Sequence, residues 1–351
     1  MKVHTIDLID GDRLEEDVFN HYGLHVLSKG TVLNSREISK LLQHQIEYVD
    51  IEQRKHVMLE SRTLESTATP KWLPSVKPIY DQTISTIENC FIQAAKDGTV
   101  DDEVVTAAIE PLFEHLQLER DVVSMLLLLN NADNYTYQHS VHVGMLTYYL
   151  ANWLGYSQDE ANTIGKAGFL HDIGKAKVDN DILNSPNKLT NDEFEEIKQH
   201  TIHGYQIIKK SLDDATLALG ALQHHERVNG SGYPYGLTGE HIHPIAKIIS
   251  VADIYSAMIS TRVYQKERDL LFVLRELYRL SFDELDPTTT HTFIKHMIPN
   301  FIGKQVKLNN DELGIIIMTH PNEFFRPLVQ VDNQFIDLTT EREYEIVHVY
   351  L

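Results

Sequence analysis

Residues 169–175 read FLHDIGK, and the adjacent His171 and Asp172 in this stretch decide the fold and the site that the sequence predicts. Imidazole and carboxylate groups are good ligands for iron, manganese, zinc and nickel. Because neighbouring residues on a helix point about 100° apart, the two side chains can face one site only where a helix ends. Gly174 favours such an end, since glycine is frequent just after a helix C-terminus. A single His-Asp pair is more often structural, so the prediction depends on its companions.

Further candidate ligands occupy apolar segments on both sides of this pair, namely His139, His200, His224, His225 and Asp253. His139 lies 32 positions before His171 (171 − 139), and His200 lies 28 positions after Asp172 (200 − 172). Asp253 is the single carboxylate of its apolar stretch, and an unpaired buried charge is costly unless it has a ligand role. Helices of a bundle can bring such side chains together in a dinuclear site. His139 or His200 taken alone could equally be an ordinary core or surface residue, and for His225 alone a surface position is favoured.

The spacing of apolar residues predicts a mainly α-helical protein. Residues 121–300 read as a helical bundle, with apolar positions three and four apart, and residues 77–120 read as connecting helices of the same kind. Residues 1–76 predict a small α/β module followed by a linker, which we expect to be regulatory. Residues 301–351 alternate strand-like runs with turn residues, which predicts a short antiparallel β extension.

Some local signals are more specific. Residues 22–23 predict a hairpin, residues 30–33 its return strand and residues 35–45 a helix. Thr190 has a glutamate three residues later, which is the pattern of a capping box. We therefore expect a helix that starts near Thr190 and includes His200.

The chain carries a formal net charge of −20, with 51 acidic and 31 basic side chains. Such a surface repels nucleic acid polymers and anionic membranes, so neither is expected as a partner. A small phosphate-bearing substrate is still compatible where metal cations reverse the local field. The single cysteine, Cys90, excludes an intrachain disulfide, and no run of about 18 apolar residues predicts a transmembrane helix. With an N-terminus unlike a signal peptide, these features predict a cytoplasmic protein.

A loop of defined shape is predicted directly after His224 and His225, where residues 226–234 read ERVNGSGYP. Its glycines, tyrosine and proline are typical of a helix-ending loop. They also suit a wall that orients a substrate over the metals, with Tyr233 as an aromatic face.

These stretches together resemble the HD-GYP family, bacterial phosphodiesterases of the His-Asp superfamily that act on cyclic di-GMP. The resemblance rests on FLHDIGK, on the histidine pair with the GYP loop, and on YTYQHS at residues 135–140. Asp253 and the residues as far as Arg262 fit the same pattern. The resemblance covers about residues 121–300.

The resemblance implies metal ligands at His139, His171, Asp172, His200, His224, His225 and Asp253. Asp172 would bridge two cations, which such a carboxylate holds at about 3.5–4 Å in two-metal phosphodiester chemistry. Lys175 and Arg262 would contact the substrate phosphate as point and fork charges. The loop residues Gly232, Tyr233 and Pro234 would also bind substrate, and the catalytic residues would be Asp172 and Lys175.

Two positions depart from the family pattern. Members with a third metal carry a glutamate one helical turn before the first histidine, whereas this chain has Tyr135, with Asp133 nearby. We therefore expect two divalent transition-metal ions, iron or manganese, with zinc, nickel or cobalt as alternatives, and no third metal. The second departure is Gln265, where the family often has a basic residue. Lys266 follows it, and substrate binding is expected to be weaker.

The function implied by the resemblance is metal-dependent hydrolysis of cyclic di-GMP to linear pGpG. Cleavage on to GMP is less expected, because the family links that step to the third metal. The alternatives are a catalytically weak cyclic di-GMP-binding signalling protein, a His-Asp hydrolase for another cyclic dinucleotide, and a redox di-iron enzyme of the same superfamily. A homodimer is expected, with protein partners contacting the N-terminal module.

Overall fold

The computed structural model describes residues 2–4, 12–19, 25–33, 37, 41, 46, 48–51, 70, 72–118, 122–129, 135–183, 190–212, 214–260 and 270–350. By its internal contacts the chain divides into two compact units, Met1–Ala68 and Thr69–Leu351. The predicted hairpin tip at residues 22–23, most of the predicted helix at 35–45 and most of the linker lie outside the described residues. The finer division of the chain at residues 77, 121 and 301 stays a prediction.

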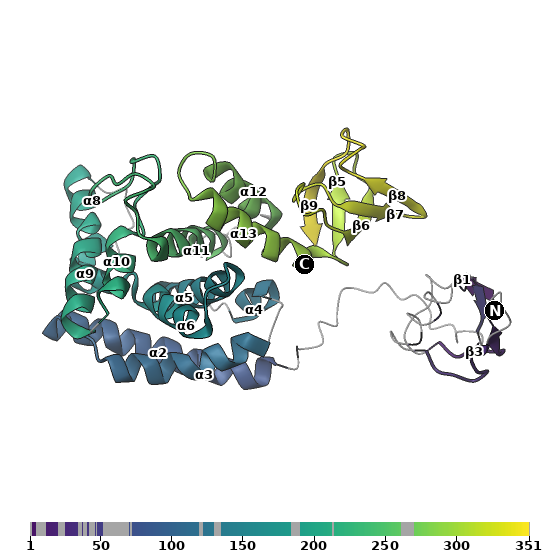
Figure 1. Ribbon diagram of the computed structural model, residues 1–351, viewed down its shortest axis with the longest axis horizontal. Helices are drawn as coiled ribbons and strands as arrows, with labels where there is room; N and C mark the ends of the chain where they lie inside the picture. The colour runs from purple at the N-terminus through teal and green to yellow at the C-terminus, as the bar shows by residue number, and fades with distance from the viewer. Residues whose placement is uncertain are drawn as a thin grey trace. The chain divides into compact units, whose positions relative to one another are not determined.

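The larger unit is mainly helical, as predicted. Its helices are α2 (Leu73–Asp97), α3 (Asp102–Leu118), α4 (Val122–Leu129), α5 (Tyr135–Trp153), α6 (Gln158–Leu170), α7 (Asn180–Leu183), α8 (Asn191–Lys198), α9 (His200–Ser211), α10 (Ala215–Gln223), α11 (Pro244–Ser260), α12 (Leu270–Leu280) and α13 (Pro287–Met297), with the short 3₁₀ helices η2 (Ile173–Lys177) and η3 (Ile298–Phe301) (Figure 1). None of the described helices is both long and apolar enough to cross a bilayer.

Helix α5 is the central helix of this unit. Residues 138–151 are buried on every side, because α5 packs against α2, α6, α11 and α13. In Figure 1 the pair α5 and α6 lies between α2 and α3 on one side and α11 on the other. A helix that is covered all round can hold a polar side chain only where that side chain has a partner. Each buried histidine of α5 therefore needs a specific explanation.

Two glycines let α5 and α6 approach closely. A Cβ on Gly144 would lie 2.3 Å from the ring of Phe169, and one on Gly168 would lie 2.7 Å from Oγ1 of Thr147. No side chain fits in either place without displacing its neighbour. This close contact fixes the C-terminal end of α6, where the His-Asp pair begins.

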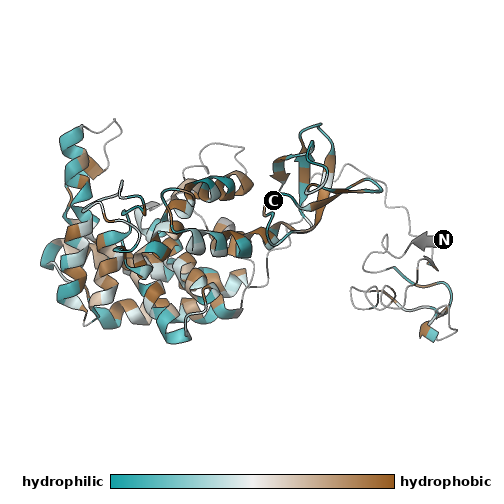
Figure 2. Cartoon of the chain, turned by 45° about the horizontal axis from the view of Figure 1, so that its top comes forward, coloured by the Kyte–Doolittle hydropathy of each residue, from teal (hydrophilic) through white to brown (hydrophobic). Residues whose placement is uncertain are grey.

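The C-terminal segment forms a five-stranded antiparallel sheet in the order β8-β7-β6-β5-β9, which confirms the predicted β extension. The strands are β5 (Gln305–Leu308), β6 (Leu313–Met318), β7 (Leu328–Val331), β8 (Gln334–Asp337) and β9 (Ile346–Tyr350). The sequence pattern indicated β6, β7 and β9 and missed β5 and β8, although these two strands are as long as β7. The buried side chains of the sheet belong to the same apolar core as the helices. Figure 2 shows both hydrophobic and hydrophilic residues on this sheet.

The smaller unit contains two short antiparallel pairs. Strand β1 (Lys2–His4) pairs with β4 (Tyr48–Asp50), and β2 (Val18–Phe19) pairs with β3 (His25–Leu27). The prediction of a return strand at residues 30–33 is wrong, because these residues form only an isolated β-bridge, between Val32 and Arg13. The strand that returns from the hairpin is β3, one segment earlier.

Two helices of the larger unit begin with capping boxes. In one box the Ser157 hydroxyl accepts from the Glu160 N–H at the start of α6, and in the other the Thr190 hydroxyl accepts from the Glu193 N–H at the start of α8. The predicted start at Thr190 is therefore confirmed. The prediction that His200 belongs to that same helix is wrong, because α8 ends at Lys198 and α9 begins at His200.

Candidate metal centre

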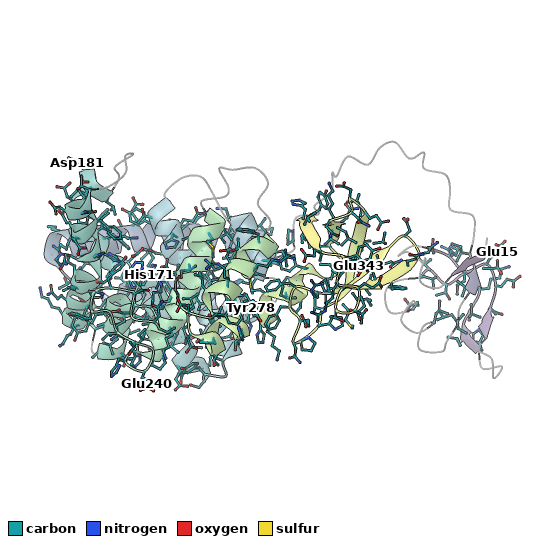
Figure 3. The ribbon with its side chains drawn as sticks, turned by 90° about the horizontal axis from the view of Figure 1, so that it is seen from above. Glu15, His171, Asp181, Glu240, Tyr278 and Glu343 are labelled. Carbon is teal, nitrogen blue, oxygen red and sulfur yellow. The ribbon has the colours of Figure 1, made fainter. Side chains whose placement is uncertain are left out.

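His171 and Asp172 lie at a junction of two helices, as the sequence predicts. His171 caps the C-terminus of α6, and Asp172 is the N-cap of η2. The Nδ1 of His171 lies 2.8 Å from the Gly168 carbonyl oxygen, which directs Nε2 inward. That Nε2 lies 3.2 Å from Oδ2 of Asp172, and both side chains are almost fully buried. Figure 3 shows His171 among the helices of the larger unit.

Gly174 has a different role from the one expected of a glycine after a helix. It has no left-handed backbone conformation, since it lies inside η2. A Cβ at this position would lie 1.9 Å from the His200 carbonyl oxygen and 2.4 Å from the Gly204 nitrogen. Gly174 therefore allows the backbone of η2 to lie directly on the first turn of α9. This contact brings Asp172 next to His200.

Four of the predicted ligands form one cluster, the Asp172 group, which consists of Asp172, His200, His224 and His225. Their ligand atoms lie within 4.8 Å of one another. Oδ1 of Asp172 lies 3.3 Å from Nε2 of His200 and 3.8 Å from Nε2 of His224. The Nδ1 atoms of these two histidines bond to carbonyls of the preceding turn, at 2.6 Å to Ile197 and 2.9 Å to Ala221. Their Nε2 atoms are thus fixed toward the carboxylate.

The other three form the Asp253 group, which consists of His139, His171 and Asp253, again within 4.8 Å. His139 comes from α5 and Asp253 from α11, and Nε2 of the histidine lies 3.0 Å from Oδ1 of the aspartate. Nδ1 of His139 lies 3.0 Å from the Ser256 hydroxyl. Oδ1 of Asp253 is also 4.0 Å from Nε2 of His171. The carboxylate predicted to be costly inside the apolar α11 is therefore surrounded by histidines.

The two groups meet at Asp172. Its Oδ1 faces the histidines of its own group, and its Oδ2 faces His171 of the Asp253 group. Two buried atoms here, Oδ1 of Asp172 and Nε2 of His171, have no hydrogen-bond partner. A buried polar atom without a partner is rare and calls for a cause, such as an ion. The donor set of imidazoles and carboxylates suits divalent transition metals, so the described residues fit the predicted metals.

The electrostatics of the cluster also favour cations. Burial raises the pKa of Asp172, but His171 and Lys175 outweigh that effect and hold this pKa well below its usual range. Burial lowers the pKa of His224, and it lowers that of His225 to about 3. Burial also lowers the pKa of His171, yet the Asp172 carboxylate reverses this and raises it. The centre thus offers ionised carboxylates with mostly neutral imidazoles, the protonation states in which these groups bind metals.

Lys175 lies inside the centre. Its Nζ is 2.5 Å from Oδ2 of Asp172, and its side chain is partly exposed. A lysine carries its charge on a flexible stem, so the ammonium can also reach an anion beside the carboxylate.

The loop after His225 is held against the histidines by its backbone. A Cβ on Gly232 would lie 2.4 Å from both the His225 carbonyl oxygen and the Arg227 nitrogen, so only glycine fits. The Tyr233 N–H donates to the same carbonyl of His225 at 3.1 Å. The Tyr233 ring then stacks on the imidazole of His225, with centroids 4.6 Å apart. The predicted loop residue Tyr233 therefore forms a wall of the centre.

The sequence pattern did not single out three residues that shape this site. Glu226 is buried and accepts from the Tyr235 and Leu237 N–H groups at 2.8 and 2.9 Å, which closes the loop. Phe194 of α8 is 46% exposed beside Tyr233, and the Lys198 ammonium lies over its ring. The position of Glu226 directly after the histidine pair could have indicated its role. Phe194 gave none, because α8 reads as an ordinary exposed helix.

Several predicted positions lie outside the description. Arg262, Gln265, Lys266 and Asp133 are not among the described residues, and the side chain of Tyr135 is not described either. The predicted phosphate contact of Arg262 and the argument for two metals from Tyr135 therefore stay predictions.

A helical bundle whose helix ends converge on a buried histidine–aspartate cluster defines the class of this protein. Residues 121–288 match the family model of the HD domain. This segment of the chain is therefore similar to the HD domain family. The HD-domain phosphohydrolases are metal-dependent, which agrees with the cluster described above.

Two curated relatives and one solved structure illustrate the similarity. The chain is 30% identical over 246 residues to a cyclic di-GMP phosphodiesterase of Pseudomonas aeruginosa, covering 70% of this chain and 59% of the relative. It is 37% identical over 197 residues to a cyclic di-GMP phosphodiesterase of Thermotoga maritima, covering 55% and 52%. The chain thus spans little more than half the length of these relatives. The structure of an HDG"Y"P protein from Bdellovibrio bacteriovorus matches with a TM-score of 0.52 at 17% identity, covering 84% of this chain and 97% of that one, and shows a shared fold.

Proposed function

We propose that this protein is a metal-dependent phosphodiesterase that hydrolyses cyclic di-GMP to linear pGpG. The observation that carries the proposal is the position of Asp172, whose two oxygens face the two separate ligand groups. Such a carboxylate is suited to bridge two cations in a phosphodiesterase site. The names of the two relatives support the substrate.

The seven residues of the Asp172 and Asp253 groups would hold two divalent ions, which we propose to be iron or manganese. Ions held there would polarise the phosphodiester and lower the pKa of a water molecule. The protein itself lowers the pKa of His224 and His225, keeps its two carboxylates ionised, and fixes three imidazole rings through backbone carbonyls. The site is therefore organised before ligands arrive.

The substrate contacts follow from the exposed side of the centre. Lys175 is partly exposed and would bind a phosphate oxygen beside Asp172, and Arg262 is proposed to do the same from the segment after α11. Tyr233 and Phe194 present aromatic surface at the entrance, where a guanine base can stack. Gly232 and Pro234 set the position of the Tyr233 ring.

The cellular setting stays part of the same proposal. We expect the protein to act in the cytoplasm as a homodimer, with the smaller unit as a regulatory module. We expect pGpG rather than GMP to be the main product.

The test uses the full chain, purified without oxygen and loaded separately with iron or manganese. Each sample is incubated with cyclic di-GMP, its products are separated by chromatography, and its metal content is measured. The proposal expects pGpG with about two metals per chain. Absence of turnover with either metal would contradict it, and binding without turnover would favour the signalling alternative.

Two further arms sharpen the test. Asp181→Ala on the exposed α7 is the matched control for Asp172→Ala, since it removes a carboxylate near the centre in sequence but outside both groups. A panel of other cyclic dinucleotides tests the substrate. Faster hydrolysis of another member would replace cyclic di-GMP with that nucleotide and leave the chemistry unchanged.

A further inference from the structure

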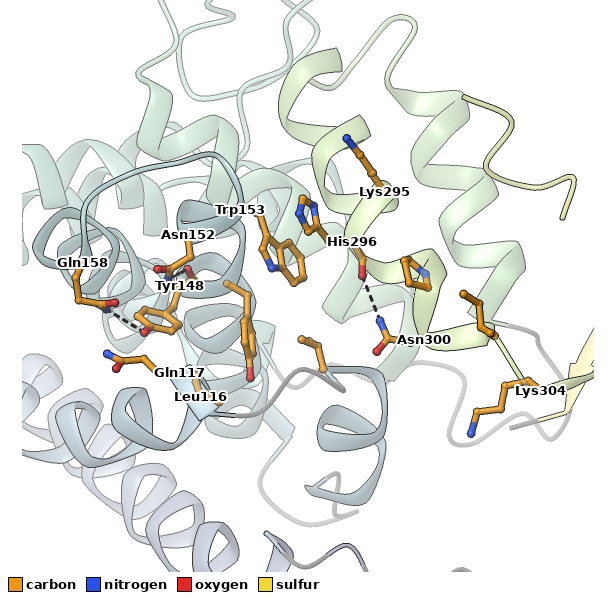
Figure 4. Close-up of a pocket in the computed structure, with 14 residues that line it drawn as sticks. Leu116, Gln117, Tyr148, Asn152, Trp153, Gln158, Lys295, His296, Asn300 and Lys304 are labelled. Carbon is orange, nitrogen blue, oxygen red and sulfur yellow. Dashed lines mark hydrogen bonds between the residues drawn. The ribbon is translucent and has the colours of Figure 1, made fainter. Parts of the chain in front are cut away.

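A large cavity lies at the opposite end of α5 from the metal centre. Its volume is about 1120 Å³, and its walls come from the end of α3, the second half of α5, and the segment from α13 to β5 (Figure 4). Trp153, in its wall, lies 14 residues after His139 on the same helix, which is about 20 Å at 1.5 Å per residue. The cavity is thus separate from the candidate metal centre.

One wall of the cavity is a ladder of stacked rings. The Trp153 indole lies parallel to the His296 imidazole, with centroids 4.8 Å apart and an interplanar angle of 6°. The Tyr149 ring also stacks with Trp153, with centroids 5.7 Å apart and an interplanar angle of 23°. Nδ1 of His296 bonds to the Thr292 carbonyl at 2.9 Å, which fixes the ring in place. Such a rigid, partly exposed aromatic wall suits a flat ring of a ligand.

The charge of the described lining is opposite to that of the chain. The described lining contains Lys295 and Lys304 but no aspartate or glutamate, although the chain has 51 acidic and 31 basic residues. Among the described residues, neither Lys295 nor Lys304 forms an ion pair with a carboxylate. Two unpaired cations beside an aromatic wall favour an anionic ligand.

Amide side chains complete the lining. Gln117, Asn152, Gln158 and Asn300 all line the cavity. The amide nitrogens of Asn152 and Asn300 donate to backbone carbonyls of their own helical segments, at 2.8 and 2.9 Å, which holds these side chains in place. Their carbonyl oxygens can accept from a polar ring edge. The aromatic wall suits the base of a nucleotide, and the amides suit the polar edge of that base. The lysines suit its phosphate.

We propose that this cavity is a second binding site and that it takes a nucleotide. The base stacks on the Trp153–His296 wall, and the phosphate is bound by Lys295 and Lys304. The proposal goes beyond the hydrolysis proposed above and does not depend on it, since no residue of the metal centre lines this cavity.

The experiment uses the full chain with Asp172→Ala, kept free of metal so that the catalytic centre turns over no ligand. A second change, Trp72→Phe, leaves Trp153 as the sole tryptophan, since the chain has two. GMP and AMP are the probes, and binding is followed by tryptophan fluorescence and calorimetry. Saturable quenching of Trp153 by GMP or AMP is the expected result.

Charge reversal then locates the binding. Lys295→Glu with Lys304→Glu should weaken nucleotide binding about a hundredfold, at about tenfold for each lost phosphate contact. Lys209→Glu on the exposed face of α9 is the matched control and should leave the affinity unchanged. Both lysines of the cavity are at least partly exposed, so the double variant should still fold.

Three results would overturn the proposal. The first is no quenching at millimolar nucleotide, and the second is unchanged affinity in the double lysine variant. The third is inorganic phosphate binding as tightly as GMP, since the aromatic wall would then contribute nothing. Each result is independent of whether the metal-loaded wild-type protein hydrolyses cyclic di-GMP, so the two proposals fail separately.

Discussion

The Asp172 group and the Asp253 group meet at one candidate metal centre but differ in how their side chains are held. In the Asp172 group, His200 begins a helix, His224 follows one, and each has Nδ1 bonded to a carbonyl of its preceding turn. In the Asp253 group, His139 and Asp253 lie inside helices and are held by each other and by Ser256. His200 and His224 of the first group are therefore held by the backbone. In the second group only His171 has such a backbone contact, and His139 and Asp253 are held by side chains.

This difference teaches where each group is vulnerable. A backbone carbonyl survives any substitution of its residue, so the rings of the Asp172 group have supports that mutation cannot remove directly. The hydroxyl that supports His139 can be removed by one substitution. The Asp253 group should therefore lose its metal first when supporting residues change.

The largest expected effect tests the carboxylate that both groups share. Asp172→Ala should remove both metals and reduce turnover about a thousandfold or more, since metals contribute several kcal/mol to such reactions at about 1.4 kcal/mol per tenfold. Metal analysis and product formation measure the two losses together. Retained turnover would show that Asp172 is not the shared ligand.

The next prediction separates the groups. Asp253→Asn should lower the metal content from about two ions to about one per chain, and His200→Ala should do the same through the other group. Elemental analysis of the two variants and of the double variant measures this directly. If either single variant lost both metals, the two groups would not be independent sites.

A smaller effect is expected at the support of His139. Ser256→Ala should weaken one metal about 10–100-fold, the usual result of losing the hydrogen-bond partner of a metal-ligating histidine. Competition with a chelator measures the affinity of each ion. Ser256→Thr keeps the hydroxyl and should restore binding, whereas a loss caused only by packing would not be rescued in this way.

The smallest effect concerns His142, a buried histidine of α5 outside both groups. Its Nε2 lies 2.8 Å from the Tyr80 hydroxyl, and burial lowers its pKa from 6.5 to about 3. The unfolded chain therefore takes up a proton below about pH 6.5 while the folded chain does not, so stability falls on acidification. His142→Gln should reduce this slope by up to about 1.4 kcal/mol per pH unit between pH 6 and 5.

Urea unfolding of the metal-free protein at several pH values measures that slope. The metal content of His142→Gln should equal that of the wild type. If the variant lost a metal, His142 would be one of the metal ligands, and it could not serve as a histidine outside both groups.

Much of this site could be predicted from the sequence because its ligands occur in short, spaced motifs. The structure brings together all seven predicted ligands, and the helix end at His171 is where the pattern indicated. The break between α8 and α9 could not be predicted, since no glycine or proline marks it and both halves favour helix. The role of Gly174 was also hidden, because it depends on a backbone 26 residues later in the chain (200 − 174).

Residues that matter through contacts with distant segments, and not through a local motif, were missed for the same reason. Phe194 becomes relevant only when α8 lies beside the loop that carries Tyr233. Lys295 and Lys304 look like ordinary surface lysines until α5 and the end of α13 face each other across the cavity. Sequence patterns report the period of a single segment, and these contacts join segments far apart in the chain.

The direct packing of Gly174 on the first turn of α9 has a consequence for redesign. The spacing between Asp172 and His200 is set by two backbones in contact, with Gly204 as the second glycine at the junction. Changes of shape elsewhere in the apolar core should therefore be absorbed before they reach this spacing. The helices around the junction can be repacked for heat resistance with the ligand geometry retained, provided that both glycines stay.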